Sequence, residues 1–208
     1  MFRFTRHGFR EMLIGTLALM LAGAALGWML WPLALAVLPL LIWLFAFFRD
    51  PEREMPVEQH AVVSPADGTV SDITEIANED RLNGPCVRVG IFLSVFNVHV
   101  NRSPCDGRVI DVTYKKGTFI NAMRHDDASS DNESNTIVLA EPRGDRPAVV
   151  VKQIVGLIAR RIVCTARVGD KVARGQRIGM IKFGSRTELY IAKWLDPQIK
   201  VSVGQIVR

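Results

Sequence analysis

The chain has 208 residues, 49% of them hydrophobic, and a formal net charge of +5. This length allows one ordinary domain with an appendage, and its three cysteines, which show no CxxC spacing, indicate neither a disulfide framework nor a metal site. The positive charge would suit nucleic acid, but next to a membrane segment anionic lipid is the expected partner. The alternative is that the positive charge only keeps the protein soluble. We therefore expect a membrane-associated protein of a reducing compartment that binds no nucleic acid.

The N-terminal segment predicts a membrane anchor. Residues 12–48 contain no charged side chain, and one helix of this length would be about 55 Å long, far longer than the ~30 Å core of a bilayer. Pro32 lies near the middle of the run. We therefore expect two short hydrophobic helices, at about 12–30 and 32–48, that form a transmembrane hairpin within an anchor of residues 1–50.

Basic residues set the expected orientation of this anchor. Arginines lie on both sides of the apolar run: Arg3, Arg6, Arg10, Arg49 and Arg53. The positive-inside rule then places both ends, and the domain that follows, on the cytoplasmic face of the cell membrane. A cleaved signal peptide and a single kinked span, which would put the rest of the chain outside, are the alternatives.

Residues 51–208 predict a mainly β domain. Segments rich in Val and Ile, such as AVVVKQIVGLI and QRIGMIKF, are bounded by Gly or Pro, which is typical of short antiparallel strands in a barrel or sandwich. The pattern RVGDKVARGQRIGMI (167–181) resembles the tight hairpin of lipoyl and biotinyl domains. It favours a barrel-sandwich hybrid core of that type, although the same hairpin occurs in many β proteins.

The sequence also contains an internal repeat. SPADGTVSDIT begins at Ser64 and SPCDGRVIDVT begins at Ser103, 39 residues later, with seven identical positions. A repeat of this size predicts two similar strand-turn-strand elements related by pseudo-symmetry. The polar stretch 123–136 predicts a long loop, which is either functional or mobile.

The stretch IKFGSRTELYI (181–191) contains the residues most suggestive of chemistry. Its flanks predict β-strand, yet Gly184 and Ser185 interrupt them. One interpretation is a β-bulge, in which Gly supplies an unusual backbone angle. The other is self-cleavage, because glycine tolerates strained backbone and leaves its carbonyl open to attack by the next residue's hydroxyl.

Self-cleavage would convert Ser185 into a keto group. The Ser185 hydroxyl attacks the Gly184 carbonyl carbon to give an ester, β-elimination breaks that ester and leaves dehydroalanine, and hydrolysis of the resulting imine releases ammonia. The products are fragment 1–184 and fragment 185–208, the second capped by a pyruvoyl group. A serine needs a base, and an Asp–His–Ser relay of Asp67, His99 and Ser185 would supply one. A buried structural role is the alternative for His99.

Five motifs in order, FFRDPER, SPADGTV, FLSVFNVHVNRSP, QIVGLIARRIV and GDKVARGQRIGMIKFGSR, resemble those of the phosphatidylserine decarboxylase family in its short form, whose processing site reads FGSR. The resemblance covers most of residues 47–190. It implies a pyruvoyl-dependent carboxy-lyase that forms phosphatidylethanolamine and CO₂ through a Schiff base between substrate and the pyruvoyl group, without a metal. It also implies an alpha chain (185–208) and a beta chain (1–184) from one precursor, and leaves a homo-oligomer open.

By position, the resemblance implies that Ser185 becomes the pyruvoyl group, that Gly184 is the cleavage partner and that Asp67 and His99 are polar partners, with His99 returning a proton to the substrate carbon. Two departures stand out. Longer members of the family have a second histidine at the position of Arg102, and NERN is replaced here by NESN (132–135), to which we assign no role.

Two other functions are compatible with parts of the sequence. A non-enzymatic membrane adaptor also combines a membrane anchor with a lipoyl-like β domain, but it normally carries heptad repeats, which this sequence lacks. A membrane-bound serine hydrolase would use Ser185 without cutting its own chain. Basic residues of the β domain would face anionic lipid or solvent: Arg160, Arg161, Arg167, Lys171, Arg174 and Arg177.

Overall fold

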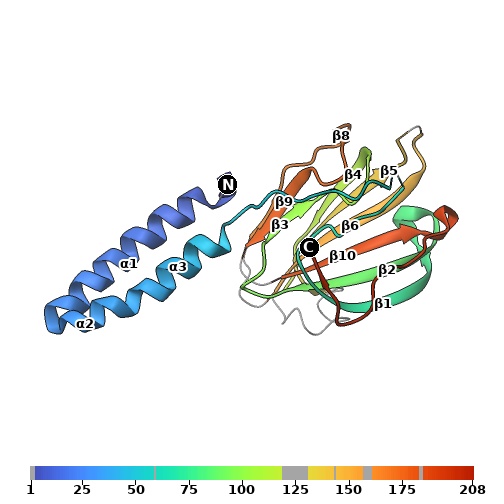
Figure 1. The fold of residues 1–208 in the computed structure, drawn as a ribbon. Helices are drawn as coiled ribbons and strands as arrows, with labels where there is room; N and C mark the ends of the chain where they lie inside the picture. The colour runs from blue at the N-terminus through green and yellow to red at the C-terminus, as the bar shows by residue number, and fades with distance from the viewer. Residues whose placement is uncertain (1–2, 59, 119–130, 143, 157–160, 183–184) are drawn as a thin grey trace. The chain divides into compact units, whose positions relative to one another are not determined.

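The computed structural model describes residues 3–58, 60–118, 131–142, 144–156, 161–182 and 185–208. It divides into two compact units, Met1–Glu52 and Arg53–Arg208. The first is helical and the second is built mainly from strands (Figure 1).

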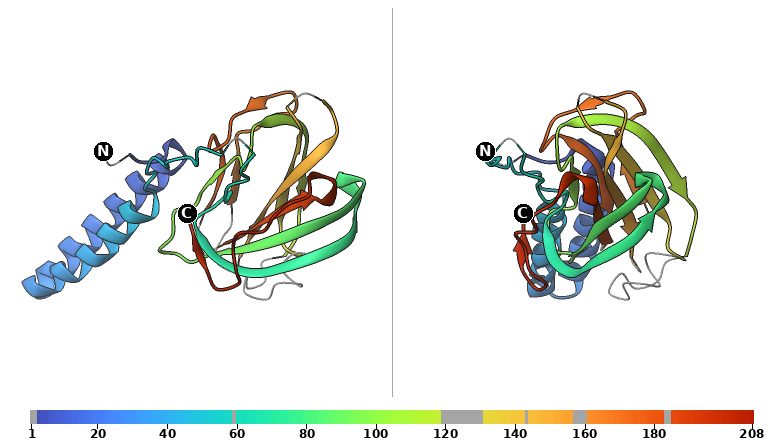
Figure 2. Two further views of the ribbon diagram at one scale, coloured as in Figure 1. Left: turned by 45° about the vertical axis from the view of Figure 1, so that its right-hand side comes forward. Right: turned by 90° about the vertical axis from the view of Figure 1, so that its right-hand side faces the viewer.

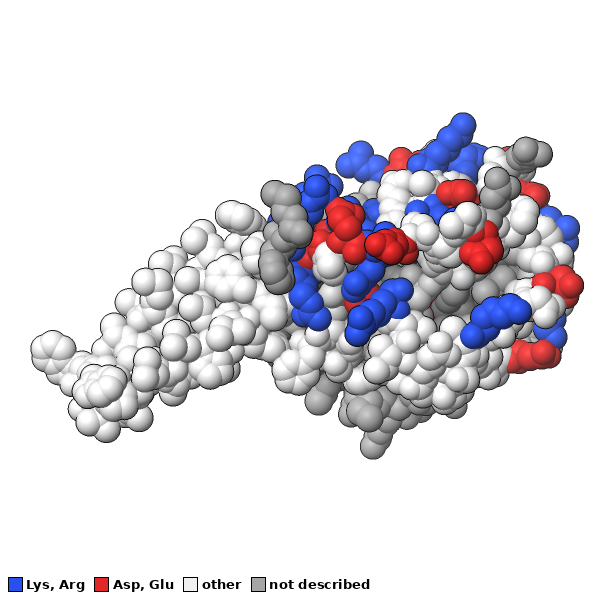
Figure 3. All heavy atoms as spheres, viewed as in Figure 1, with Lys and Arg blue, Asp and Glu red and all other residues white. Residues whose placement is uncertain are grey.

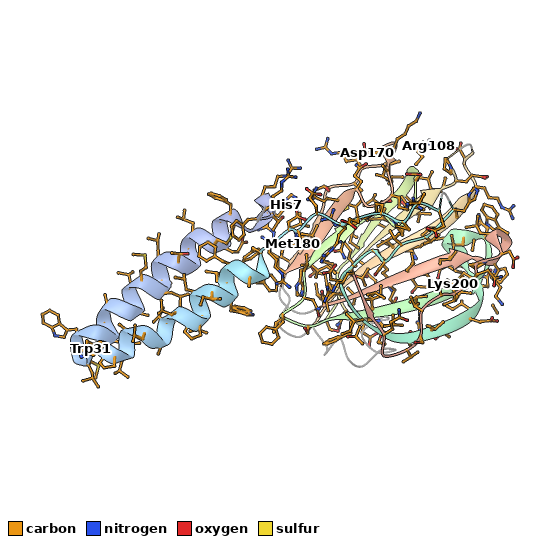
Figure 4. The ribbon with its side chains drawn as sticks, in the orientation of Figure 1. His7, Trp31, Arg108, Asp170, Met180 and Lys200 are labelled. Carbon is orange, nitrogen blue, oxygen red and sulfur yellow. The ribbon has the colours of Figure 1, made fainter. Side chains whose placement is uncertain are left out.

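The N-terminal unit is a hairpin of apolar helices. Its elements in chain order are η1 (Arg6–Gly8), α1 (Phe9–Met29), α2 (Trp31–Ala34), η2 (Leu35–Val37) and α3 (Leu38–Phe47). The chain reverses at Leu30, which has extended backbone (φ −158°, ψ 115°), and Trp31 lies at this turn (Figure 4). Two backbone hydrogen bonds, from Thr5 to Phe48 and from Asp50 to Arg3, bring the two ends of the hairpin together.

Small residues of η1 and α1 allow the two arms of the hairpin to approach each other. A Cβ atom on Gly15 would lie 2.8 Å from Leu44, and one on Gly8 would overlap the Phe48 ring. Such contacts are typical of helices that pack in lipid. The helical stretch Arg6–Met29 has the length and apolar composition needed to cross a membrane, whereas the second apolar stretch, Trp31–Phe47, is shorter.

The C-terminal unit contains two antiparallel sheets. The larger sheet has the order β11-β1-β2-β10-β6-β5-β4-β8, and the smaller has the order β3-β9-β7. The bounds are β1 (Gly68–Glu79), β2 (Gly84–Leu93), β3 (Val100–Arg102), β4 (Gly107–Lys115), β5 (Ser134–Ala140), β6 (Pro147–Val155), β7 (Arg161–Cys164), β8 (Lys171–Val172), β9 (Arg177–Lys182), β10 (Ser185–Ala192) and β11 (Ile206–Val207), with turns η3 (Asp80–Leu82) and η4 (Lys193–Leu195).

The large sheet curls strongly, and the small sheet lies against part of it (Figure 2). One apolar cluster joins the sheets, because it combines Ile137, Val151 and Leu189 of the large sheet with Ile178 of the small one. The mainly β architecture is therefore confirmed. The specific likeness to lipoyl domains remains a prediction.

The large sheet has an internal two-fold pattern, and it explains the repeat in the sequence. Arg102 N–H donates to the Pro65 carbonyl and Val63 N–H donates to the Pro104 carbonyl, both at 2.9 Å, so the two SPxDG segments bond to each other reciprocally. β1 and β4, which follow the two segments, each have a register shift at the same point, before Asp72 and before Asp111. The predicted pseudo-symmetry is present in the fold.

Candidate functional site

Ser185 begins a new strand rather than continuing an old one. β9 ends at Lys182 in the small sheet, and β10 begins at Ser185 in the large sheet. Gly184 itself lies outside the described residues. The β-bulge interpretation of the Gly-Ser pair therefore stays a prediction; the described residues show only that β9 and β10 belong to different sheets.

The Ser185 side chain is buried and has no hydrogen-bond partner among the described residues. Its residue has no exposed surface, and its Oγ makes no hydrogen bond within the described part of the chain. A buried hydroxyl left unpaired costs about 1–3 kcal/mol, and native proteins rarely retain one without a reason. A buried hydroxyl without a partner among the described residues is compatible with the predicted role of Ser185 as a nucleophile, which stays a prediction.

Neighbouring strands define which face of the large sheet Ser185 occupies. Ser185 pairs with Leu93 of β2 and with Val155 of β6, and directly opposite residues of antiparallel strands lie on the same face. Val155 packs with Ile181 of β9 and with Ile162 of β7. The hydroxyl thus belongs to the face of the large sheet that the small sheet covers.

His99 lies next to β3 of the small sheet, which covers this face of the large sheet. It precedes β3, it is fully buried, and its carbonyl accepts a hydrogen bond from the Ile181 N–H at 3.2 Å. Its Nδ1 lies 3.0 Å from the Asn97 carbonyl, which leaves Nε2 as the ring atom for other contacts. His99 and Val155, the cross-strand partner of Ser185, thus both contact Ile181 of β9. The relay itself stays a prediction.

Asp67 lies at the same end of the large sheet, but two strands from Ser185. Thr69, Phe92 and Arg186 are in register across β1, β2 and β10, and adjacent strands are about 4.8 Å apart. A separation of about 10 Å between the strands requires a third group to connect the two side chains. The Asp67 carboxylate accepts a hydrogen bond from Arg53.

Asp67 also lines a pocket with Arg102, the position where longer family members have histidine. Arg53, Val100 and Arg208 contribute to the same pocket. The Arg102 side chain is mostly buried, and its Nη1 donates to the Gly175 carbonyl at 3.1 Å. Arginine keeps its proton at any working pH, so at this position it can hold an anionic group but cannot act as a proton donor.

A ladder of buried amides, which the sequence did not reveal, connects the two sheets beside Ser185. Asn135 Nδ2 donates to Gln153 Oε1 (3.0 Å), Gln153 Nε2 donates to Asn101 Oδ1 (2.9 Å), and Asn101 Nδ2 donates to Thr187 Oγ1 (3.1 Å). Thr187 lies on the face of β10 that also carries Ser185. The only signal in the sequence was a polar residue inside each Val-rich strand.

Asn132, in the NESN segment, also lies close to the site. It is fully buried, and its Nδ2 donates to the carbonyl of Val155 at 2.8 Å. Val155 is the cross-strand partner of Ser185. Asn132, to which we assigned no role from the sequence, therefore fixes the strand end beside Ser185.

At least one of the basic residues expected to face lipid or solvent is engaged in hydrogen bonds within the protein. The Arg174 guanidinium donates to the carbonyls of Pro56, Glu58 and Ala61, so it holds the segment that precedes β1. Acidic and basic side chains are mixed on the visible face of the β unit (Figure 3). Arg160 lies outside the described residues.

Comparisons with known proteins assign the chain to a family. A family model described as phosphatidylserine decarboxylase matches residues 40–208. The phosphatidylserine decarboxylase proenzyme of Rhodopirellula baltica is 45% identical over 207 residues, which cover 98% of this chain and 84% of that protein. The proenzymes of Trichlorobacter lovleyi (48% over 194 residues, 91% and 84%) and Solidesulfovibrio magneticus (51% over 178 residues, 84% and 79%) are similar as well.

These matches define the class of protein as a decarboxylase, a lyase made as a proenzyme. The chain belongs to the phosphatidylserine decarboxylase family. Family membership decides against the non-enzymatic adaptor, which the fold alone did not exclude.

Proposed function

We propose that this protein converts phosphatidylserine to phosphatidylethanolamine and CO₂, using a pyruvoyl group formed from Ser185. The observation that carries the proposal is the buried, unpartnered Ser185 hydroxyl at the first position of a central strand, in a chain whose relatives are named phosphatidylserine decarboxylase proenzymes. A serine that served only for packing would be expected to have a hydrogen-bond partner.

The residues around Ser185 fit a pyruvoyl group. Conversion of the serine would remove the hydroxyl that lacks a partner among the described residues, and the new keto group would lie opposite Leu93 and Val155 on the neighbouring strands. A pyruvoyl group supplies an electrophilic carbonyl that reacts with the substrate amine and accepts the electron pair released when CO₂ departs.

The chain's own residues carry out the cleavage. The Ser185 Oγ attacks the carbonyl carbon of Gly184, and His99 takes the hydroxyl proton. The peptide C–N bond then breaks, the proton passes to the nitrogen of residue 185, and an ester links the two parts of the chain. Elimination then breaks the ester and releases residues 1–184 with a free carboxylate, and water replaces the nitrogen of residue 185, which departs as ammonia. The resulting beta chain (1–184) and alpha chain (185–208) remain paired, because β10 lies between β2 and β6 in the large sheet.

Proton transfer in the decarboxylation falls to His99. Histidine suits this task because its unperturbed pKa lies near working pH, and this ring is buried beside the end of β9. Asp67 would orient it, as the acid of a triad orients its histidine. Arg102, which lines the pocket with Asp67, would hold the carboxylate or phosphate of the headgroup.

The apolar hairpin would bring the protein to the bilayer in which the proposed substrate lies. The two acyl chains of phosphatidylserine stay in a bilayer, and a segment such as Arg6–Met29, long and apolar enough to cross one, would keep the β unit at its surface. Arginines on both sides of the hairpin favour the cytoplasmic face of the cell membrane. Anionic lipid is then both substrate and partner.

Intact-mass spectrometry of the purified protein tests the proposal. We expect two chains divided after Gly184, the smaller one lighter than a peptide beginning with Ser by the mass of one ammonia. Ser185→Ala should remain one chain without decarboxylase activity. A serine hydrolase would keep its chain whole, so an active enzyme of full-length mass, or turnover by the alanine variant, would exclude the pyruvoyl role.

A further inference from the structure

A buried cluster of charged side chains begins directly after Ser185, and neither the cleavage nor the decarboxylation described above uses it. Arg186 has no exposed surface. Its Nε donates to Glu188 Oε1 (2.9 Å), its Nη1 donates to Ser71 Oγ (2.6 Å) and its Nη2 donates to Asp72 Oδ2 (2.5 Å). A fully buried guanidinium is rare, and this one is held by three side chains at once.

The arginine reaches these partners by crossing a strand at a glycine. β2 lies between β1 and β10, and its residue Gly90 pairs with Asp72 on one side and with Glu188 on the other. A Cβ atom at Gly90 would lie 2.1 Å from the Arg186 Nη2 and 2.2 Å from the Asp72 Oδ2. The missing side chain of Gly90 is therefore what allows the contact to form.

Other charged and polar side chains lie next to Asp72 and Glu188, the two acidic partners of Arg186. Arg88 Nη2 lies 3.2 Å from the second Asp72 oxygen, the Tyr190 hydroxyl donates to Glu188 Oε2 at 2.6 Å, and Lys152 is the cross-strand partner of Glu188. Burial raises the pKa of Asp72, but hydrogen bonds and charge from Arg186 outweigh this effect and keep that pKa below its usual value. Asp72 is thus ionised and paired.

The proposed cut divides this cluster between two chains. Arg186 and Glu188 belong to the alpha chain, whereas Ser71 and Asp72 belong to the beta chain. We propose that Arg186 is a positioning residue that clamps the new end of the alpha chain to the beta chain and so keeps residue 185 in place after cleavage. The inference rests on the proposed function.

Cleavage creates the need for such a clamp. Residue 185 loses its covalent link to residue 184, and conversion to a keto group also removes its backbone N–H. Chain ends fray unless they are tied down, and a shift of about 1 Å at a reacting group can slow a reaction about 100-fold. Before cleavage, the intact backbone holds residue 185 without help from Arg186.

Three substitutions distinguish a role of Arg186 in positioning residue 185 from a general contribution to folding stability. Arg186→Lys keeps the charge, but one ammonium group does not span Asp72 and Glu188 as the planar guanidinium does. Gly90→Ala displaces the clamp without removing any of its groups. Arg88→Lys is the matched control, because it perturbs the same Asp72 carboxylate but leaves the bonds between the two chains intact.

Each substitution is made in the cleavable chain and in the uncleavable Ser185→Ala chain, in detergent. We measure the urea midpoint of unfolding, release of the 185–208 fragment by gel filtration, and kcat and KM of the processed enzyme. We expect Arg186→Lys and Gly90→Ala to lower the midpoint more in the cleaved protein than in the uncleaved one. We also expect them to lower kcat about 10- to 100-fold with little change in KM, and Arg88→Lys to affect both forms equally.

Equal losses in the cleaved and uncleaved forms, or an unchanged kcat, would overturn the clamp. So would an Arg186→Lys, Ser185→Ala chain that does not fold, because Arg186 would then be needed by the precursor. If the unsubstituted protein is not cleaved, the proposed function itself fails, and the mass spectrum shows this before any variant is compared.

Discussion

Replacement of Gln153 by leucine should strongly lower the free energy of unfolding, although only one side chain changes. Gln153 occupies the middle of the buried amide ladder, and it bonds to Asn101 at 2.9 Å and to Asn135 at 3.0 Å. Leucine has a similar volume, so little cavity forms, but one polar atom on each neighbour is left unpaired. At about 1–3 kcal/mol for each atom, the expected loss is about 2–6 kcal/mol, a large part of a typical stability of about 5–15 kcal/mol.

The assay is urea unfolding followed by the circular dichroism of the β-sheet, in the Ser185→Ala background so that one chain unfolds. Gln176→Leu is the control, because Gln176 is exposed and its side-chain Oε1 accepts a hydrogen bond from the Ala173 N–H. It should cost no more than about 1.5 kcal/mol. A Gln153→Leu chain as stable as the control would show that the bonds from Gln153 to Asn101 and Asn135 contribute little to holding the two sheets together.

Three further predictions concern the site and its surroundings. His99→Ala should slow or stop the appearance of the 185–208 fragment in a mass spectrum, whereas His60→Ala, at an exposed position, should not; normal maturation and turnover in the first variant would remove His99 from the mechanism. Arg53→Met should destabilise the uncleaved chain by about 1–3 kcal/mol, because it removes a charged partner of Asp67, and an unchanged urea midpoint would contradict this. The depressed pKa of Asp72 favours the folded state fully above its unfolded value of 3.8, and this contribution is lost as the pH falls through the lower folded value. The stability difference between wild type and Asp72→Asn, measured in the Ser185→Ala background, should therefore be larger at pH 6 than at pH 3, and a pH-independent difference would exclude this role.

Local patterns in the sequence predicted the parts of the fold that depend on local chemistry. The two SPxDG segments form matching turns, with Ser64 Oγ donating to the Ala66 carbonyl at 2.6 Å and Ser103 Oγ donating to the Cys105 carbonyl at 2.7 Å. Each turn needs only its own few residues. The strand-rich character of residues 51–208 followed for the same reason.

A second, weaker repeat was not predicted from the sequence, because its two copies resemble each other mainly in backbone conformation and backbone hydrogen bonding. The segments VGDKV (168–172) and VGQIV (203–207) both edge the large sheet as β8 and β11, and each has a glycine with positive φ, Gly169 at 95° and Gly204 at 88°. Val109 N–H donates to Asp170, and Val70 N–H donates to Gln205, both at 2.9 Å. Figure 4 labels Asp170 near Arg108, beside the first of these turns.

The surroundings of Ser185 could not be predicted because they depend on long-range pairing. The sequence places Gln153, Asn101 and Thr187 in three separate Val-rich or Ile-rich segments, and nothing local indicates that their side chains meet. The same applies to Arg186 and Asp72, which are 114 residues apart in the chain. Strand order decides both clusters, and strand order is a property of the whole sheet.

The two-fold pattern of the sheet provides a strict test of what the proposed reactivity of Ser185 requires. Leu189 of β10 pairs with Val151 of β6, and the symmetric strand order relates these two strands. Ser185 and Pro147 each open their strand, four positions before that central pair. Pro147, however, follows the hairpin from β5, closed by a hydrogen bond from Glu141 N–H to the Arg146 carbonyl, and it is only partly buried.

Transfer of the Gly-Ser pair to this equivalent position should not transfer cleavage. In a Ser185→Ala chain that also carries Arg146→Gly and Pro147→Ser, the new hydroxyl would begin a strand with the same kind of backbone pairing. It would nevertheless lie after a hairpin instead of a crossing between sheets, away from His99 and within reach of water. We expect one chain of full-length mass. A cut between residues 146 and 147 would mean that a Gly-Ser pair at the start of a central strand is sufficient, and that burial and the covering sheet contribute nothing to the reaction.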